Sequence, residues 1–299
     1  MKRKVIQIAK STSVVSLPKS WTQEYNINKG DEVFLYQIKN NILIKTLNQK
    51  SDEVVLDITG LDSDLTWRYL ITAYRKGSEI IKIRYNQDAT EILQTYIKDL
   101  VGMAAIKQKE NIIVLKDFFY NYSEINANSL IKRIFKLVID MSNDILVAIK
   151  DKDVNSLKGV NYRDYNINKF TNLCLRILNK NMCEDYNKSL SMYKFVSLLE
   201  EIGDEYRRMA LVFSRNVTNL DNETLELFNE VNILLNECYN LFYGYSKDKL
   251  IIFHDKANVT LDRLKKSYKA RKNGQVLSSL DTILHLIKNL CEESLVVSI

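Results

Sequence analysis

Residues 189–215 read SLSMYKFVSLLEEIGDEYRRMALVFSR, in which apolar side chains recur every three or four positions. This spacing gathers them on one face and predicts an amphipathic helix. The same pattern recurs along the last part of the chain and predicts helices at 128–150, 162–180, 189–215, 221–244, 248–272 and 276–293. Because these helices fall into two groups of three, we expect two antiparallel three-helix bundles related as an internal repeat.

The segment before them alternates strand-like and helical patterns. Strands are expected at 53–58, 80–84, 105–109 and 112–116, with helices at 63–76 and 89–102. This order predicts a small α/β unit that precedes the helices.

The first 47 residues contain short β-rich runs around one helical turn. Val5–Ile8 and Val14–Leu17 favour strands, Pro18 can open a helix, and residues 32–36 and 42–46 can pair as a hairpin. So short a segment, with few large apolar residues, cannot enclose a core by itself. We therefore expect it to dimerise.

The net charge is concentrated in this first segment. Residues 1–50 hold nine basic and three acidic side chains, and this excess of six equals the formal net charge of the whole chain, +6. The basic and acidic side chains of residues 51–299 are therefore equal in number. A charge excess confined to one small segment favours an anionic partner for that segment alone.

Composition and motifs argue against several classes of protein. No apolar run approaches the roughly 20 residues that span a bilayer, which predicts a cytoplasmic protein without membrane insertion. The motifs GxGxxG, Walker A, HExxH and GxSxG do not occur, which predicts that the protein is not an enzyme. The cysteines Cys174, Cys183, Cys238 and Cys291 show no CxxC spacing and are expected to be reduced core residues, with zinc ligation at Cys183 as the alternative.

The first segment resembles AbrB/SpoVT domains. The resemblance rests on Arg3-Lys4-Val5, on Ser11-Thr12-Ser13-Val14-Val15-Ser16-Leu17-Pro18-Lys19-Ser20-Trp21 and on Lys29-Gly30-Asp31-Glu32-Val33. It implies an intertwined, swapped-hairpin β dimer whose basic arms and loops grip DNA. The expected DNA contacts are Lys2, Arg3, Lys4, Lys10, Ser11, Thr12, Ser13 and Lys19, because hydroxyl groups can accompany cations on phosphate oxygens.

The remainder resembles archaeal PhoU-type phosphate uptake regulators. The resemblance rests on Gly60-Leu61-Asp62, Arg68-Tyr69-Leu70 and Tyr74, on Asp164 to Phe170, and on Leu199-Glu200-Glu201-Ile202-Gly203-Asp204. Such proteins carry acidic pairs four residues apart on two helices of each triplet, which places both side chains on one helix face.

The resemblance implies metal ligands in both triplets. The matching positions are Asp164, Glu200 and Asp204 in the first, and Asp262, Asp281 and His285 in the second, whereas Asn168 and Asn258 replace acids. The expected cofactor is a divalent or iron-type metal ion. The alternatives are a solvated helix face and a hydrogen-bonded, half-buried His285. Because clustered acids repel one another, we expect a cation among the first three, or failing that a lysine or arginine.

Together these features predict a multidomain α+β protein. Its expected domains are an AbrB/SpoVT-like DNA-binding and dimerisation domain at 1–47, an α/β connecting domain at 52–120 and a PhoU-like all-α domain at 127–299. The expected function is phosphate-responsive regulation of phosphate uptake or its genes, through DNA. Two alternatives stay open: docking on a phosphate ABC transporter or signalling kinase without DNA binding, and a metal-scaffolded structural protein.

Overall fold

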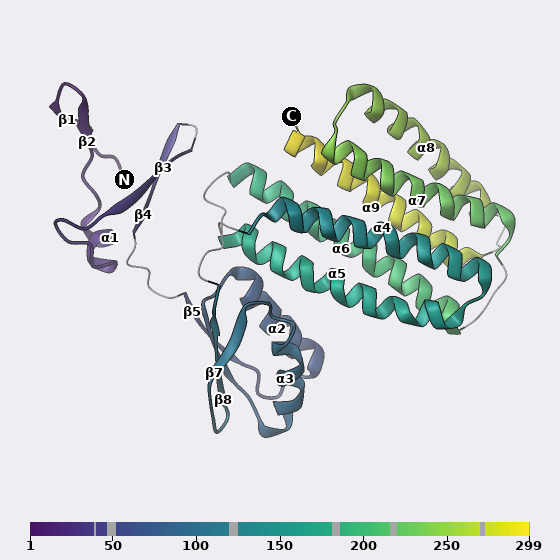
Figure 1. Ribbon diagram of the computed structural model, residues 1–299, viewed down its shortest axis with the longest axis horizontal. Helices are drawn as coiled ribbons and strands as arrows, with labels where there is room; N and C mark the ends of the chain where they lie inside the picture. The colour runs from purple at the N-terminus through teal and green to yellow at the C-terminus, as the bar shows by residue number, and fades with distance from the viewer. Residues whose placement is uncertain are drawn as a thin grey trace. The chain divides into compact units, whose positions relative to one another are not determined.

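A computed structural model describes residues 1–38, 40–46, 52–119, 125–180, 186–215, 220–269 and 273–298. The chain divides into two compact units, Met1–Glu53 and Val54–Ile299 (Figure 1). Cys183, where zinc ligation was the alternative, lies outside the described residues.

The first unit consists of two antiparallel hairpins and one short helix. β1 (Ile6–Ala9) pairs with β2 (Thr12–Val14), α1 (Lys19–Glu24) follows, and β3 (Val33–Ile38) pairs with β4 (Asn41–Thr46). The expected hairpin at 32–46 is thereby confirmed. β2 ends at Val14 instead of Leu17, because the tight turn after Ala9 pairs Ile6 with Val14 and leaves no further β1 residue to pair.

The described residues of this unit form no apolar core within one chain. Among the side chains described in residues 1–38 and 40–46, only that of Thr46 is buried. Its exposed large apolar residues are Met1, Val5, Ile6, Ile8, Val15, Phe34, Leu35, Tyr36 and Ile42. Isolated two-stranded hairpins are marginally stable in water, so this unit needs a further surface to cover them.

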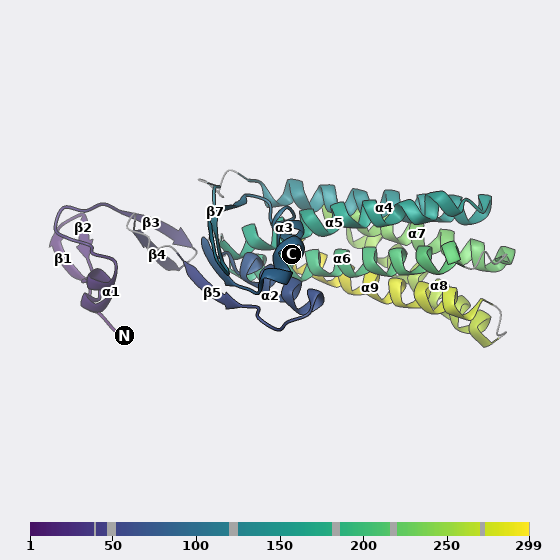
Figure 2. The same cartoon turned by 90° about the horizontal axis from the view of Figure 1, so that it is seen from below.

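The second unit begins with a four-stranded sheet. Its elements are β5 (Glu53–Asp57), α2 (Ser63–Lys76), β6 (Ile80–Arg84), the short 3-10 helix η1 (Gln87–Ala89), α3 (Thr90–Ile97), β7 (Met103–Lys109) and β8 (Ile112–Asp117), with strand order β5-β6-β8-β7. α2 and α3 cover the same face of the sheet (Figures 1 and 2). There Leu70, Ile81, Leu93 and Leu115 are buried in one core.

The ends of α2 and α3 follow from local residues. The Asp62 carboxylate accepts a hydrogen bond from Leu65 N at 2.8 Å, which caps α2, and Gly77 ends it with φ +98°. α3 stops at Ile97, short of the expected residue 102, because the chain turns toward Gly102, whose φ is +85°.

Long helices complete the second unit. They are α4 (Ala127–Asp151), α5 (Val154–Lys180), α6 (Tyr186–Arg215), α7 (Asn222–Tyr243), α8 (Lys247–Lys269) and α9 (Gly274–Ser298). α4 to α6 form one three-helix bundle and α7 to α9 another, and the two pack together where α6 meets α9 and α4 meets α7 (Figure 1). The expected pair of three-helix bundles is confirmed, and both contribute to one continuous core.

α5 begins at Val154 instead of the expected residue 162. The Asp153 carboxylate accepts hydrogen bonds from the backbone N–H groups of Asn155 and Ser156, at 3.0 and 3.1 Å, and so caps a polar first turn that apolar spacing does not reveal. Among the described helices, none combines the length and the apolar character that a membrane-spanning helix requires.

Candidate functional sites

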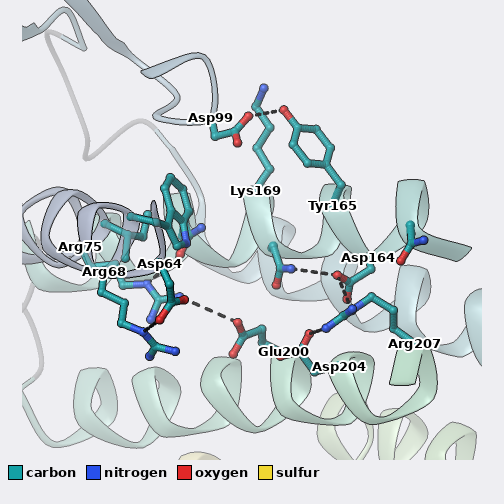
Figure 3. Close-up of a pocket in the computed structure, with 15 residues that line it drawn as sticks. Asp64, Arg68, Arg75, Asp99, Asp164, Tyr165, Lys169, Glu200, Asp204 and Arg207 are labelled. Atoms are coloured by element: carbon teal, nitrogen blue, oxygen red, sulfur yellow. Dashed lines mark hydrogen bonds and ion pairs between the residues drawn. The ribbon is translucent and has the colours of Figure 1, made fainter. Parts of the chain in front are cut away.

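A pocket of about 720 Å³ lies between α2, α5 and α6 (Figure 3). Its charged lining residues are Asp64, Arg68, Arg75, Asp99, Asp164, Lys169, Glu200, Asp204 and Arg207. α2 and α3 belong to the α/β part of the unit, and α5 and α6 to the first helical bundle. The pocket therefore lies at the junction of the α/β part and the first helical bundle.

The three acids expected in the first triplet meet at this pocket. Arg207 lies among them: its Nε is 3.1 Å from Asp164 Oδ2, and its Nη2 is 3.4 Å from Asp204 Oδ1 (Figure 3). The negative charge of Glu200 is less well neutralised, because the closest cation to its Oε1 within the described residues is Arg75, whose Nη2 lies at 4.0 Å. The cation found among these acids is thus an arginine of α6.

Burial raises the pKa of two of the acids, Asp164 and Glu200. Burial and the neighbouring Asp204 raise the pKa of Asp164 to about 6, against the opposing effect of Arg207. Burial likewise raises the pKa of Glu200 to about 7, although Arg75 lowers it. The pocket therefore disfavours further negative charge.

The same region leaves acceptor atoms unpaired. Asp164 Oδ2 accepts a hydrogen bond from Asn168 Nδ2 at 3.1 Å, whereas Asp164 Oδ1 and Asn168 Oδ1 are buried without a hydrogen-bond partner. Unpaired acceptors favour a proton or another hydrogen-bond donor over an anion.

The basic side chains of the pocket each contact an acceptor. Arg68 Nε lies 2.7 Å from Asp64 Oδ2, and Arg75 Nε donates to Asn172 Oδ1 at 2.7 Å. Lys169 Nζ donates to the backbone carbonyl of residue 98 at 3.3 Å. An anion would have to compete with these contacts, and with the nearby carboxyl groups, for the same cations.

The residues expected in the second triplet lie on α8 and α9. His285 Nδ1 is 2.8 Å from the Asp281 carbonyl oxygen and 3.6 Å from Asp281 Oδ2, and Asp262 is exposed on α8. Throughout the described residues, no three His, Cys, Asp or Glu side chains form a group that could hold a metal ion.

In each bundle, a basic residue of the third helix contacts a side chain of the second helix. Arg207 of α6 contacts Asp164 of α5, and Lys288 of α9 donates to Asn258 Oδ1 of α8 at 3.0 Å. A metal ion at either place would have to displace a protein cation. The present side chains do not fit a metal ion, and the metal role stays a prediction.

Arg176 holds α5, which lines the pocket, against α2 and β8. This role was not predicted from the sequence. Its side chain is fully buried, and it donates to Tyr74 O at 2.6 Å, to Ser78 O at 2.9 Å and to Asp117 Oδ2 at 2.6 Å. These bonds join α5 to α2 and β8. The available signal was one arginine within the apolar run Leu173 to Leu178.

The residues expected to contact DNA are exposed on the first unit. Lys2, Arg3 and Lys4 precede β1, Lys10 and Ser11 form the turn of the β1–β2 hairpin, Thr12 and Ser13 lie in β2, and Lys19 opens α1. They therefore line one hairpin and its flanks, where a polyanion can reach them.

Comparison with known families identifies two domains. Residues 6–52 match the family described as antidote-toxin recognition MazE, bacterial antitoxin, and residues 131–213 match the PhoU domain. The chain thus carries a MazE/AbrB-type domain at its N-terminus and a PhoU domain in its helical part, which confirms the family resemblance. Both belong to regulatory, non-enzymatic families.

Among solved structures, the chain is similar to the phosphate transport system regulatory protein PhoU from Streptococcus pneumoniae. The two are 16% identical with a TM-score of 0.47, over 57% of this chain and 93% of that chain. No curated protein matches the chain. The PhoU domain suggests a role in phosphate regulation, and the MazE/AbrB-type domain suggests recognition of DNA or of a toxin.

Proposed function

We propose that the protein is a dimeric regulator of phosphate uptake or its genes that binds DNA through residues 1–47. The PhoU domain supports the phosphate-related part, and the MazE/AbrB-type domain supports the DNA-binding part. The observation that carries the proposal is the charge of this segment: all six net positive charges of the chain lie in residues 1–50. A polyanion is the partner that such a segment attracts.

The dimer follows from the unburied apolar residues of the same segment. Phe34, Leu35 and Ile42 of the β3–β4 hairpin are about half exposed or more, at 49%, 65% and 70%. A second copy would cover these side chains and, at the same time, double the basic surface that DNA meets. Dimerisation and DNA binding are therefore expected to depend on the same segment, residues 1–47, through different residues.

We do not expect the pocket between α2, α5 and α6 to sense phosphate directly. It has acids with raised pKa, and its basic groups already contact acceptors. Phosphate status would then reach the protein through a partner, such as a phosphate transporter or signalling kinase, rather than through phosphate bound in this pocket.

Recognition of a polypeptide is the second candidate function. The description of the matched N-terminal family names toxin recognition. An exposed, partly apolar hairpin can bind a protein as well as DNA. In this case residues 1–47 would still be required, but DNA affinity would be weak and insensitive to sequence.

The discriminating experiment measures binding to DNA from upstream of phosphate-transport genes and to random DNA of equal length. The full chain is compared with residues 52–299, which contain both buried cores and should fold alone. We expect the full chain to prefer the upstream DNA and the shortened chain to bind neither. Equal, weak binding of both DNAs by the full chain would favour the polypeptide partner.

A further inference from the structure

The four-stranded sheet has a second face, which α2 and α3 do not cover (Figures 1 and 2). Side chains alternate between the two faces along each strand. The paired residues Ile81 and Leu115 point to the covered face, where they belong to the core. Their neighbours Lys82 and Val114, which also pair, therefore point to the opposite face. We call this opposite face of β5, β6, β8 and β7 the outer sheet face.

The outer sheet face carries more basic than acidic side chains. Its basic residues are Lys82, Arg84, Lys107, Lys109 and Lys116. Its acidic residues are Glu53 and Asp57 of β5, because the alternate residues Val54 and Leu56 pack against the core. Asp57 Oδ2 lies 3.5 Å from Arg84 Nη1. Since basic and acidic side chains are equal in number over residues 51–299, this positive excess is local to the face.

Three lysines of this face are accessible to a partner. Lys107 and Lys109 of β7 and Lys116 of β8 are exposed. Lys109 Nζ lies 3.9 Å from the carboxylate of Glu110 in the adjacent turn, but these side chains are 74% and 83% exposed. Water screens so exposed a pair, and its loss costs little. These lysines can therefore bind an anion without leaving a buried charge unpaired.

Apolar side chains lie among these cations. Val114 of β8 is flanked by Lys82 on β6 and by Lys107 on β7. Further along the same face, Ile112 is 43% exposed, and Val55 of β5 is 63% exposed. A partner that combines acidic groups with apolar side chains would therefore complement this face better than a purely hydrophilic anion.

The shape and composition of the face favour a polypeptide over nucleic acid. Four strands spaced by about 4.8 Å span about 14 Å before side chains are added, whereas the DNA major groove is about 12 Å wide and admits a two-stranded ribbon. None of the described residues on the outer sheet face is aromatic, so unpaired bases find no stacking surface there. A second copy of this chain would present the same positive charge and be repelled.

We propose that the outer sheet face docks an acidic segment of a partner protein. The carboxylates of this segment bind Lys107, Lys109 and Lys116, and its apolar side chains cover Ile112 and Val55. Charge complementarity and the exposed apolar residues carry this assignment. Docking at this face needs no DNA contact by residues 1–47, so this proposal and the proposed function can fail separately.

The test measures binding of a labelled, soluble peptide of glutamates interspersed with isoleucines. The protein is the full-length chain with Lys2, Arg3, Lys4 and Lys10 replaced by alanine, so that these cations of the first unit do not capture the peptide. A peptide with glutamine in place of each glutamate is the control. We expect the acidic peptide to bind at least about 10-fold more tightly than this control, with an affinity that falls as salt is added. Equal binding of the two peptides would overturn the proposal.

Variants in the same background locate the contact. Changing Lys107→Gln, Lys109→Gln and Lys116→Gln together should weaken binding of the acidic peptide at least about 10-fold. A matched control changes three exposed lysines of α8 to glutamine and should leave the affinity unchanged: Lys249, Lys265 and Lys266.

Ile112→Thr tests the apolar part of the contact. It keeps a β-branched residue in β8 and should weaken binding at least about 2-fold. Circular dichroism and the melting temperature check that each variant folds. The proposal is wrong if the three sheet lysines can be replaced without weakening peptide binding. It is also wrong if their replacement weakens binding to duplex DNA or to phosphatidylserine vesicles but not to the peptide.

Discussion

The acids of the pocket should make stability depend on pH. Burial raises the pKa of Asp164 to about 6 and that of Glu200 to about 7. A carboxyl group whose pKa is raised in the folded state contributes stability below its unfolded pKa, and this contribution is lost as the pH rises through the folded pKa. For these two groups the window runs from about pH 4 to about pH 7.

Glu200→Gln should remove part of that dependence. Relative to the native chain, we expect the free energy of unfolding of this variant to be higher at pH 8 than at pH 5, by on the order of 1 kcal/mol. The expected difference is small because Glu200 is partly exposed. Urea unfolding at both pH values measures the difference, with the exposed neighbour Glu201→Gln as control. If the native chain and Glu200→Gln lose the same stability between pH 5 and pH 8, the account of Glu200 is wrong.

Arg207 is expected to act as the cation of the acidic cluster. Arg207→Ala should destabilise the protein by roughly 1–3 kcal/mol, because Asp164 and Asp204 lose their shared partner. Added magnesium or manganese should recover part of the lost melting temperature in this variant and leave the native chain unchanged. Arg163→Ala is the matched control, since Arg163 pairs with Asp144 and both side chains are about half exposed.

The opposite outcome would support a metal site. A metal-dependent rise in the melting temperature of the native chain would show that a metal ion binds the folded protein. Glu200→Ala with Asp204→Ala should then abolish more of that rise than Asp281→Ala with His285→Ala, because the first pair keeps two acids.

At the scale of elements, the buried Arg176–Asp117 pair is expected to hold α5 against the sheet. Arg176→Met leaves Asp117 buried without its main partner, which costs about 3 kcal/mol or more. Arg163→Ala breaks a half-exposed ion pair with Asp144 and should cost less than about 1 kcal/mol. Chemical unfolding of both variants checks the contrast. Equal effects would mean that Arg176 does not anchor this contact.

Local patterns predicted most elements of the fold. Apolar spacing found α6 and the hairpin of β7 and β8 because a period of 3.6 or 2 is set by the element itself. It missed the first turn of α5, where the Asp153 cap rather than an apolar face starts the helix. It also extended α3 to Gly102, whose φ of +85° belongs to the following turn.

The candidate pocket was less predictable. The acidic pair Glu200 and Asp204 could be read from its spacing of four residues, and Arg207, one turn further on, could have been added by the same rule. The bond from Arg75 to Asn172 could not, because it joins residues 97 apart in the chain. Such contacts depend on how helices pack, which no local period specifies.

At the scale of the whole molecule, residues 1–47 should be the main dimer contact. Their hairpins expose apolar residues, whereas residues 54–298 contain extensive buried cores. Sedimentation should therefore find a dimer of the full chain and a monomer of residues 52–299 at the same concentration. If the shortened chain keeps the same dimer affinity, the contact lies in the helical part.

The central claim is that the charge of the first unit binds DNA. Replacing Lys2, Arg3, Lys4 and Lys10 by alanine removes four exposed charges from the β1–β2 hairpin and its flank. A matched control replaces Lys247, Lys249, Lys265 and Lys266, which are exposed on α8, and so removes the same net charge elsewhere. Only the first change should remove phosphate contacts.

The deciding measurement is DNA affinity as a function of salt concentration for the native chain and both variants. The account predicts that the hairpin variant binds at least about 10-fold more weakly, with a shallower dependence of affinity on salt, while the α8 variant matches the native chain. Equal affinities and salt slopes for the native chain and the hairpin variant would contradict the account.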